Sequence, residues 1–136
     1  MQASGSTETT DTVSIPAKQG NRLFPVFLKL EQLNVLLVGG GKVGLEKLNA
    51  LLQNAPSAEV TVVATSVSPG VTELAQQFIN VDIKERAFQE TDLHNRDLVM
   101  VAVDNKATSA WIRSLAKEKK LLVNVADTPD LCDFYL

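Results

Sequence analysis

A glycine-rich stretch at residues 39–44 follows an apolar run and fits the pattern G-x-G-x-x-G. The pattern is informative here because it lies between a predicted strand, 34–38, and a predicted helix in which leucines recur at helical spacing. Gly39 permits a tight turn, Gly41 lets a pyrophosphate approach backbone N–H groups, and Gly44 allows close packing of helix on strand. We therefore predict a dinucleotide site. The alternative is a glycine-rich turn without a ligand.

The acidic residue that usually binds the ribose hydroxyls after the second strand is missing. Glu59 lies about twenty residues beyond the glycine loop, but it begins the predicted strand 59–64. That strand is followed by Thr65 and Ser66. These hydroxyls suit the ribose of either NAD or NADP, so the residues alone do not choose between the two cofactors.

A second candidate for chemistry is Asp127, which follows the last apolar run, 121–125. At the ligand-binding edge of a sheet its carboxylate could accept a proton during a dehydrogenation. It could equally organise the turn before Pro129 by hydrogen bonding to the backbone. Position alone leaves both interpretations open.

The remaining residues with reactive or aromatic side chains favour structural roles. Asp130 and Asp133 continue the carboxylates at intervals of three, but with no second histidine and no thiolate pair we predict no protein metal site. His94, the single histidine, lies in a polar stretch and is predicted to be solvated. Helix 107–119 is expected to bury one face in the core, formed by Ala107, Ala110, Trp111, Ser114 and Leu115.

Short apolar strands alternate with amphipathic helices along the chain and would position these residues. The predicted strands are 34–38, 59–64, 81–85, 97–103 and 121–125. Right-handed crossovers then give an α/β fold, a Rossmann-like doubly wound parallel sheet with strand order 3-2-1-4-5. Ligands of such sheets bind at the carboxyl ends of the strands, so the glycine loop, Thr65, Ser66, Asp104 and Asp127 should converge.

Composition narrows the class of protein. The 136 residues carry a net charge of -3 and a sequence pI near 5.1, which argue against a nucleic-acid partner. The single cysteine, Cys132, cannot form an internal disulfide and indicates a cytoplasmic setting, and apolar runs of strand length predict no membrane segment. Residues 1–20 are predicted to be a flexible tail, and 21–136 one NAD(P)-binding domain.

Four stretches together resemble a specific family. They are FPVFLKL at 24–30, GGGKVGLEK at 39–47, VDN at 103–105 and NVADTPDLCDF at 124–134. This set is similar to the precorrin-2 dehydrogenase and sirohydrochlorin ferrochelatase module of siroheme synthases, over residues 23–136. Val103 departs from the family, which often has threonine there.

The resemblance implies NAD-dependent oxidation of precorrin-2, a tetrapyrrole, to sirohydrochlorin, and some members of the family also insert ferrous iron. It also implies that Asp127 is the catalytic residue. The predicted cofactor site comprises Gly39, Gly41, Lys42, Val43, Gly44, Thr65, Ser66, Val103 and Asp104.

The family continues beyond Leu136 into dimerisation and tetrapyrrole-binding segments, so we expect a homodimer whose substrate site those segments complete. The competing hypothesis is a regulatory nucleotide sensor that uses the same fold without catalysis. Such sensors usually carry the acidic ribose ligand after the second strand and need no aspartate at the Asp127 turn. This sequence has the reverse arrangement.

Overall fold

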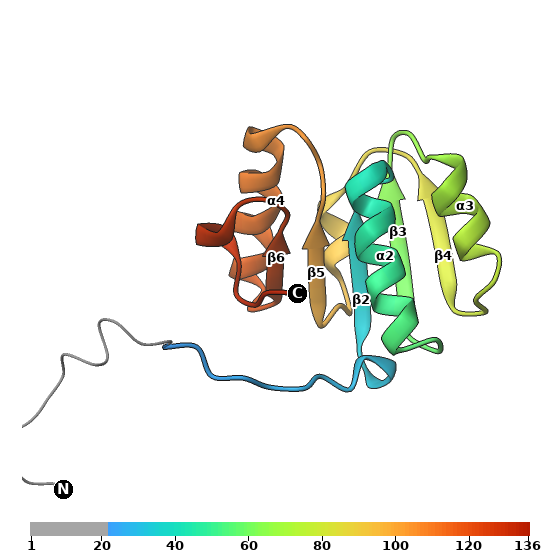
Figure 1. Cartoon of the computed structure of the whole chain (residues 1–136). Coiled ribbons are helices and arrows are strands. Elements are labelled where there is room, and N and C mark those ends of the chain that lie inside the picture. Colours follow the sequence, from blue (N-terminus) through green and yellow to red (C-terminus); the bar gives the residue numbers. More distant parts are fainter. Residues whose placement is uncertain (1–21) are drawn as a thin grey trace, which may run out of the picture.

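A computed structural model describes residues 22–136 and contains one parallel sheet of five strands with helices on both faces (Figure 1). The strands lie in the order β4-β3-β2-β5-β6. Since β2 is the first strand along the chain, this is the predicted order 3-2-1-4-5, and the doubly wound fold is confirmed. The tail predicted at 1–20 lies outside the described residues. The strand bounds are β2 Asn34–Val38, β3 Glu59–Ala64, β4 Val81–Glu85, β5 Leu98–Val101 and β6 Leu122–Val125.

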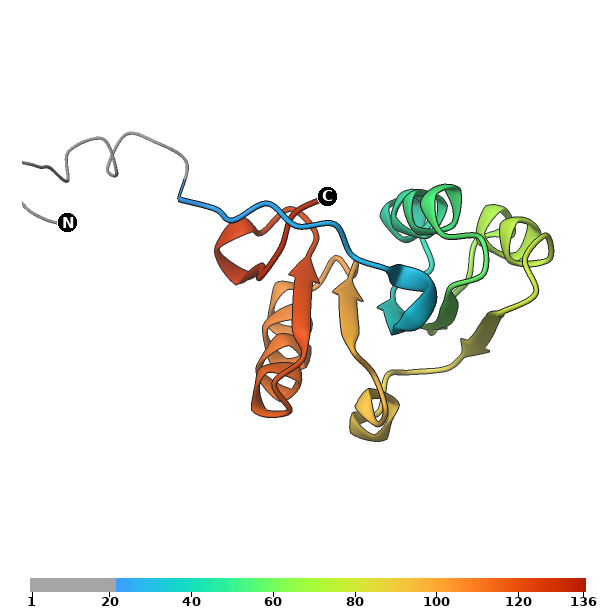
Figure 2. The ribbon, with the colours of Figure 1, turned by 90° about the horizontal axis from the view of Figure 1, so that it is seen from below.

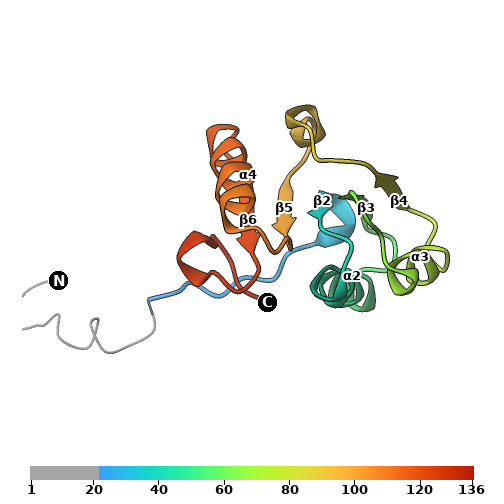
Figure 3. The same ribbon diagram turned by 90° about the horizontal axis from the view of Figure 1, so that it is seen from above.

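The connecting helices divide between the two faces of the sheet. Figure 3 shows α2 (Lys42–Asn54) and α3 (Pro69–Ala75) on one face and α4 (Lys106–Glu118) on the other. The described residues also contain three short 3-10 helices, η1 (Leu30–Gln32), η2 (Glu90–Leu93) and η3 (Pro129–Leu131). Each face therefore needs its own apolar layer, as parallel sheets with two covered faces generally do.

Alternate residues of the central strands supply these two layers. In β2, Val35 and Leu37 pack with α2 and α3, while Leu36 and Val38 pack toward α4. All four are 3% exposed or less. The continuous apolar run of β2 is thus explained by burial on both sides, and it fixes the glycine loop at the carboxyl end of a rigid central strand.

Helix α4 is where the structure departs most from the sequence-based expectation. Its buried residues are Ser109, Ile112 and Ala116, so the face predicted to be core is wrong. Trp111, assigned to that core, is 50% exposed. The helix begins at Lys106 because the Asn105 side chain accepts a hydrogen bond from the backbone N–H of Thr108. Smaller differences are limited to element ends, such as β5, which stops at Val101.

The two ends of the described chain lie beside each other. Residues 22–29 run extended beneath the sheet and pass the C-terminal residues (Figure 2). Both segments line one apolar groove of about 450 Å³, to which Phe27 and Tyr135 contribute. Phe27 is fully exposed and Tyr135 is 54% exposed. No helix within residues 22–136 has the length and apolar character needed to cross a membrane.

Candidate functional site

The glycine loop turns sharply between β2 and α2. Gly39 has a φ of 134°, a conformation that side-chain-bearing residues rarely adopt, and a Cβ atom there would clash with the carbonyl oxygen of Ala102. Gly44, in the first turn of α2, is packed so closely that a Cβ atom would lie 2.5 Å from the carbonyl oxygen of Gly39. These two glycines therefore let the helix start directly against the end of the sheet.

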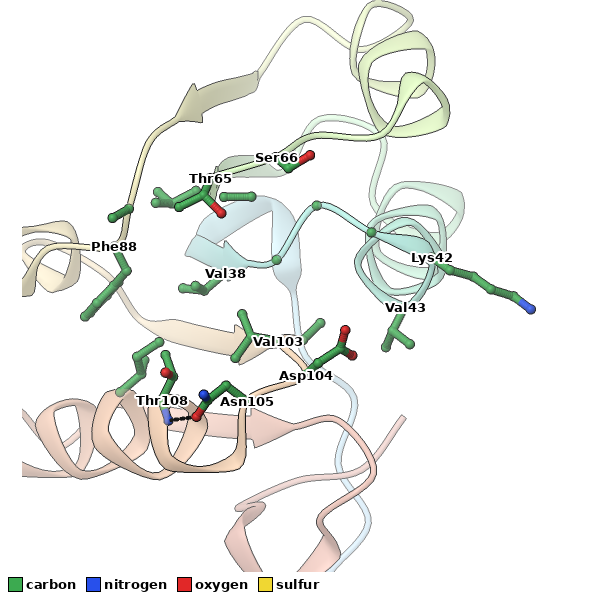
Figure 4. Close-up of a pocket in the computed structure, with 18 of the residues that line it drawn as sticks. Val38, Lys42, Val43, Thr65, Ser66, Phe88, Val103, Asp104, Asn105 and Thr108 are labelled. Atoms are coloured by element: carbon green, nitrogen blue, oxygen red, sulfur yellow. Dashed lines mark hydrogen bonds between the residues drawn. The ribbon is translucent and has the colours of Figure 1, made fainter.

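A cleft of about 560 Å³ opens above this loop at the carboxyl ends of the strands (Figure 4). Its volume is within the range of pockets that hold small molecules. It brings together eight of the predicted cofactor residues, Gly39, Gly41, Lys42, Val43, Thr65, Ser66, Val103 and Asp104. Gly44, the ninth predicted cofactor residue, does not line the cleft. The side chain of Lys42 points away from the cleft in Figure 4, so this residue faces the cleft with its backbone.

Gly41 provides a test of whether a dinucleotide fits. It is the N-cap of α2, no side chain caps that helix end, and a Cβ atom at Gly41 would meet no atom within 4 Å. Internal packing of the described chain therefore does not require glycine at this position. Open space in front of backbone N–H groups at the positive end of a helix suits a pyrophosphate. The residues present fit the phosphate part of NAD or NADP.

The loop after β3 forms the neighbouring wall of the cleft. It is tied to the glycine loop by a hydrogen bond from the Ser68 N–H to the Gly40 carbonyl, 2.8 Å long. The Glu85 carboxylate, at the end of β4, accepts a hydrogen bond from the Val67 N–H at 3.3 Å. An acidic group thus reaches this loop from the adjacent strand, although it does not line the cleft. Sequence reasoning searched only the end of β3 and missed it.

Asp127 lies in a second, smaller cleft of about 90 Å³. This cleft adjoins the larger one, because Val43, Ala102, Val103 and Asp104 line both. Asp127 is exposed and has a φ of 59°, in the left-handed region that aspartate and asparagine tolerate better than most residues. The predicted catalytic residue and the glycine loop therefore share one edge of the sheet.

The turn that carries Asp127 is held by Cys132 rather than by its own carboxylate. The Cys132 thiol accepts a hydrogen bond from the Val125 N–H at 3.2 Å, and its single proton lies within reach of the carbonyl oxygens of Val125 at 3.1 Å and Thr128 at 3.4 Å. The backbone hydrogen bond from the Thr128 N–H to the Val125 carbonyl closes the turn at 3.2 Å, and within residues 22–136 no group donates a hydrogen bond to the Asp127 carboxylate. This arrangement weakens the interpretation of Asp127 as a purely structural turn residue.

A charged network braces the segment between β4 and β5. Arg86 donates two hydrogen bonds to the Asp92 carboxylate, at 2.6 and 2.9 Å, and the Gln89 N–H donates a third at 2.8 Å. The hydrogen bonds from Arg86 lower the pKa of Asp92 below its ordinary value, although burial of this carboxyl opposes the shift. His94, just beyond, is exposed as predicted. No pattern in the sequence indicates that Asp92 is buried.

Two aromatic residues of the cleft were also missed. Phe88, which follows β4, and Trp111, on α4, line the larger cleft and contact each other edge to face. A detectable signal was the position of Phe88 just beyond a strand, at the ligand-binding edge. Among the described residues no group of three or more histidine, cysteine, aspartate or glutamate side chains could hold a metal ion.

The doubly wound sheet, the glycine loop and the cleft at its carboxyl edge define a dinucleotide-binding domain of the Rossmann class. Comparison with known proteins identifies the family. Residues 26–136 match the family described as "Putative NAD(P)-binding", and the chain belongs to this family. The predicted class of cofactor is thereby confirmed.

The proteins to which this chain is similar include siroheme synthases and a precorrin-2 dehydrogenase. The chain is 40% identical over 110 residues to the siroheme synthase of Methylococcus capsulatus and 37% identical over 113 residues to that of Nitrosomonas eutropha. These alignments cover 81% and 83% of this chain but 23% of each relative. The solved structure of SirC, precorrin-2 dehydrogenase, matches with a TM-score of 0.66 and 30% identity, over 76% of this chain and 50% of SirC. The resemblance to siroheme synthases is confirmed, and the chain spans less than a quarter of their length.

Proposed function

We propose that this chain is the NAD-binding part of an enzyme that oxidises precorrin-2 to sirohydrochlorin. The observation that carries the proposal is that the two clefts adjoin each other at one edge of the sheet. A dinucleotide whose pyrophosphate lies at Gly41 would extend past Val103 and Asp104 into the cleft lined by Asp127. The names of the siroheme synthases and of SirC support this substrate, and they favour an enzyme over a regulatory sensor.

Each part of the site has a role in this proposal. Backbone N–H groups of the glycine loop, including those of Lys42 and Val43, would bind the pyrophosphate, while Thr65 and Ser66 would bind the ribose of the adenosine. The bound cofactor supplies the hydride acceptor. Asp127 would accept the proton that leaves the tetrapyrrole in the same oxidation, a role that suits an exposed carboxylate open to a large substrate.

We extend the proposal to the domain, its cellular location and its oligomeric state. Residues 21–136 would form one domain in the cytoplasm, in keeping with the single cysteine. A homodimer would cover the apolar groove that residues 26–28 and the C-terminal residues line, in which Phe27 and Tyr135 are 102% and 54% accessible. Light scattering of the chain and of a Phe27→Ser variant tests this part, because loss of the apolar side chain should yield monomers.

The decisive experiment is anaerobic absorbance spectroscopy of precorrin-2 mixed with NAD and the protein. We expect the sirohydrochlorin spectrum with the wild type and a rate reduced by about 100-fold or more with Asp127→Asn. Asparagine is chosen because it tolerates the left-handed backbone of this turn, so a loss of rate reports chemistry rather than strain. Asp130→Asn, three residues away and also exposed, is the matched control and should keep the wild-type rate.

Two results would decide against the proposal. Binding of NAD without any oxidation of precorrin-2 would favour the regulatory sensor. Equal rates for the wild type and Asp127→Asn would remove the role assigned to this carboxylate. Adding ferrous iron and sirohydrochlorin to the same preparation tests iron insertion, with iron as a substrate and the siroheme spectrum as the result.

A further inference from the structure

The larger cleft has an apolar end that the proposed chemistry does not use. The floor of this apolar end is formed by Val38, Val63 and Ile112, which are 3% exposed or less. Phe88 and Trp111 stand over this floor as part of the lining. In Figure 4 Phe88 extends from the chain after β4 toward α4. The end of the cleft thus combines a dry apolar base with two aromatic rings.

The two rings are arranged so that aromatic surface remains available. Their centroids are 5.5 Å apart and their planes are at 88°, an edge-to-face contact. Such a contact uses only one face of one ring, and Trp111 is 50% exposed. A half-exposed indole at the wall of an apolar cleft can stack on a flat ligand.

The segment that carries Phe88 is held before any ligand arrives. Arg86 precedes it and Gln89 follows it, and both donate hydrogen bonds to the buried Asp92 carboxylate. Arg86 also donates to the carbonyl oxygen of Ala87 at 3.0 Å. Preorganisation of this kind lowers the entropy that binding must overcome, which favours a ligand site over an accidental hollow.

The adjoining smaller cleft has different chemistry. There Asp104 and Asp127 contribute two carboxylates and Lys106 one ammonium group. The nicotinamide ring of an oxidised dinucleotide is cationic and is favoured near carboxylates, whereas adenine is neutral, flat and largely apolar. Charge and polarity therefore orient the cofactor, with its nicotinamide toward Asp127 and its adenine toward the aromatic end.

We infer that Phe88 and Trp111 form an adenine-binding subsite. In this subsite Trp111 stacks on the base, and Phe88 holds the indole in place through the edge-to-face contact between the two rings. The inference rests on the proposed function, because it takes the dinucleotide to be the ligand of this cleft. It assigns a binding role to two residues that lie outside the glycine loop.

The test uses the full chain and two probes that share one half of NAD each, ADP and nicotinamide mononucleotide. Binding is measured by isothermal titration and by the fluorescence of Trp111, the single tryptophan of the chain. We expect ADP and NAD to quench this fluorescence. Trp111→Leu should weaken ADP and NAD by about tenfold, the loss typical of one base–aromatic stack, while Trp111→Phe should stay within about threefold of wild type.

Control variants separate stacking from general damage. Tyr135→Leu removes a ring of similar exposure from the other groove and should leave ADP affinity unchanged. Phe88→Leu should weaken ADP less than Trp111→Leu does, since it removes only the edge contact. The affinity for nicotinamide mononucleotide should be the same in the wild type and Trp111→Leu.

The outcomes distinguish this inference from the function on which it rests. If the wild type and Trp111→Leu bind ADP equally, the subsite is overturned while NAD binding and the proposed function stand. If Trp111→Leu weakens nicotinamide mononucleotide or sirohydrochlorin but not ADP, the aromatic end serves another ligand and the inference is also overturned. If the wild type binds no NAD at all, the proposed function fails and the subsite fails with it.

Discussion

Val123 and Asp133 hold each other through two hydrogen bonds. The Asp133 N–H donates to the Val123 carbonyl at 2.7 Å, and the Val123 N–H donates to the Asp133 carboxylate at 3.0 Å. Val123 belongs to β6, the strand at one edge of the sheet, so the C-terminal residues satisfy backbone groups that an edge strand would otherwise expose. The same fold-back closes the turn that carries Asp127.

Replacement of Asp133 should therefore weaken the fold at this edge. Asp133→Ala removes the acceptor for the Val123 N–H and the partner of Lys117, whose ammonium lies 2.7 Å from the carboxylate. We expect the free energy of unfolding to fall by about 1–2 kcal/mol, measured by urea denaturation. Asp130→Ala, at an exposed neighbouring carboxylate, should change it by less than about 0.5 kcal/mol. Equal effects of both variants would contradict this role.

The stability contributed by Asp92 should depend on pH in a defined direction. Its pKa is lowered in the folded chain by the hydrogen bonds from Arg86. A carboxyl with a lowered folded pKa stabilises the fold above its unfolded pKa, about 3.9, and loses that contribution as pH falls through the folded value. Asp92→Asn should therefore melt below the wild type at pH 7.

The gap between the two proteins should narrow as the pH is lowered below about 4. Thermal melts from pH 7 to pH 3 measure this trend. Asp82→Asn, at an exposed carboxylate 3.4 Å from the Lys84 ammonium, is the control and should follow the wild type. A difference for Asp92→Asn that stayed constant over this range would show that its charge is not the cause.

The sequence predicted the sheet well because four of its strands, β2, β3, β5 and β6, are short and largely apolar runs whose residues are mostly buried. It failed on α4, where the apolar residues spread over a wide arc of the helix and do not single out the face that is buried. Ile112 and Ala116 are one turn apart and reach the core, while Trp111 faces the cleft. Spacing cannot reveal this choice, because it depends on where η2 and Phe88 lie. The burial of Asp92 could not be predicted for a similar reason, since it depends on the position of Arg86.

Two glycines of the loop should respond oppositely to alanine. Gly44→Ala places a Cβ atom 2.5 Å from the Gly39 carbonyl oxygen and should destabilise the fold by about 1–2 kcal/mol net of the better helix propensity of alanine. Gly41→Ala meets no atom within 4 Å and should cost less than about 1 kcal/mol. Urea denaturation compares the two variants.

Ligand binding should be affected in the reverse order. The Cβ atom of Gly41→Ala would occupy the open space in front of the α2 N-terminus, so NAD affinity should fall by at least about tenfold while the fold is retained. Isothermal titration at matched fractions of folded protein measures this. A Gly41→Ala protein that binds NAD like the wild type would exclude this position as the pyrophosphate site.

Lys42 should contribute to cofactor binding through its backbone alone. Its side chain points away from the cleft (Figure 4). Its backbone N–H belongs to the first turn of α2, where N–H groups have no partner within the helix and would bind the proposed pyrophosphate. Lys42→Ala keeps that N–H group and should bind NAD within about threefold of the wild type. The small remaining difference should vanish at high salt, because a solvent-exposed charge acts over a distance that ions screen. A loss of tenfold or more that persists in salt would mean that the ammonium group turns inward to contact the phosphates directly.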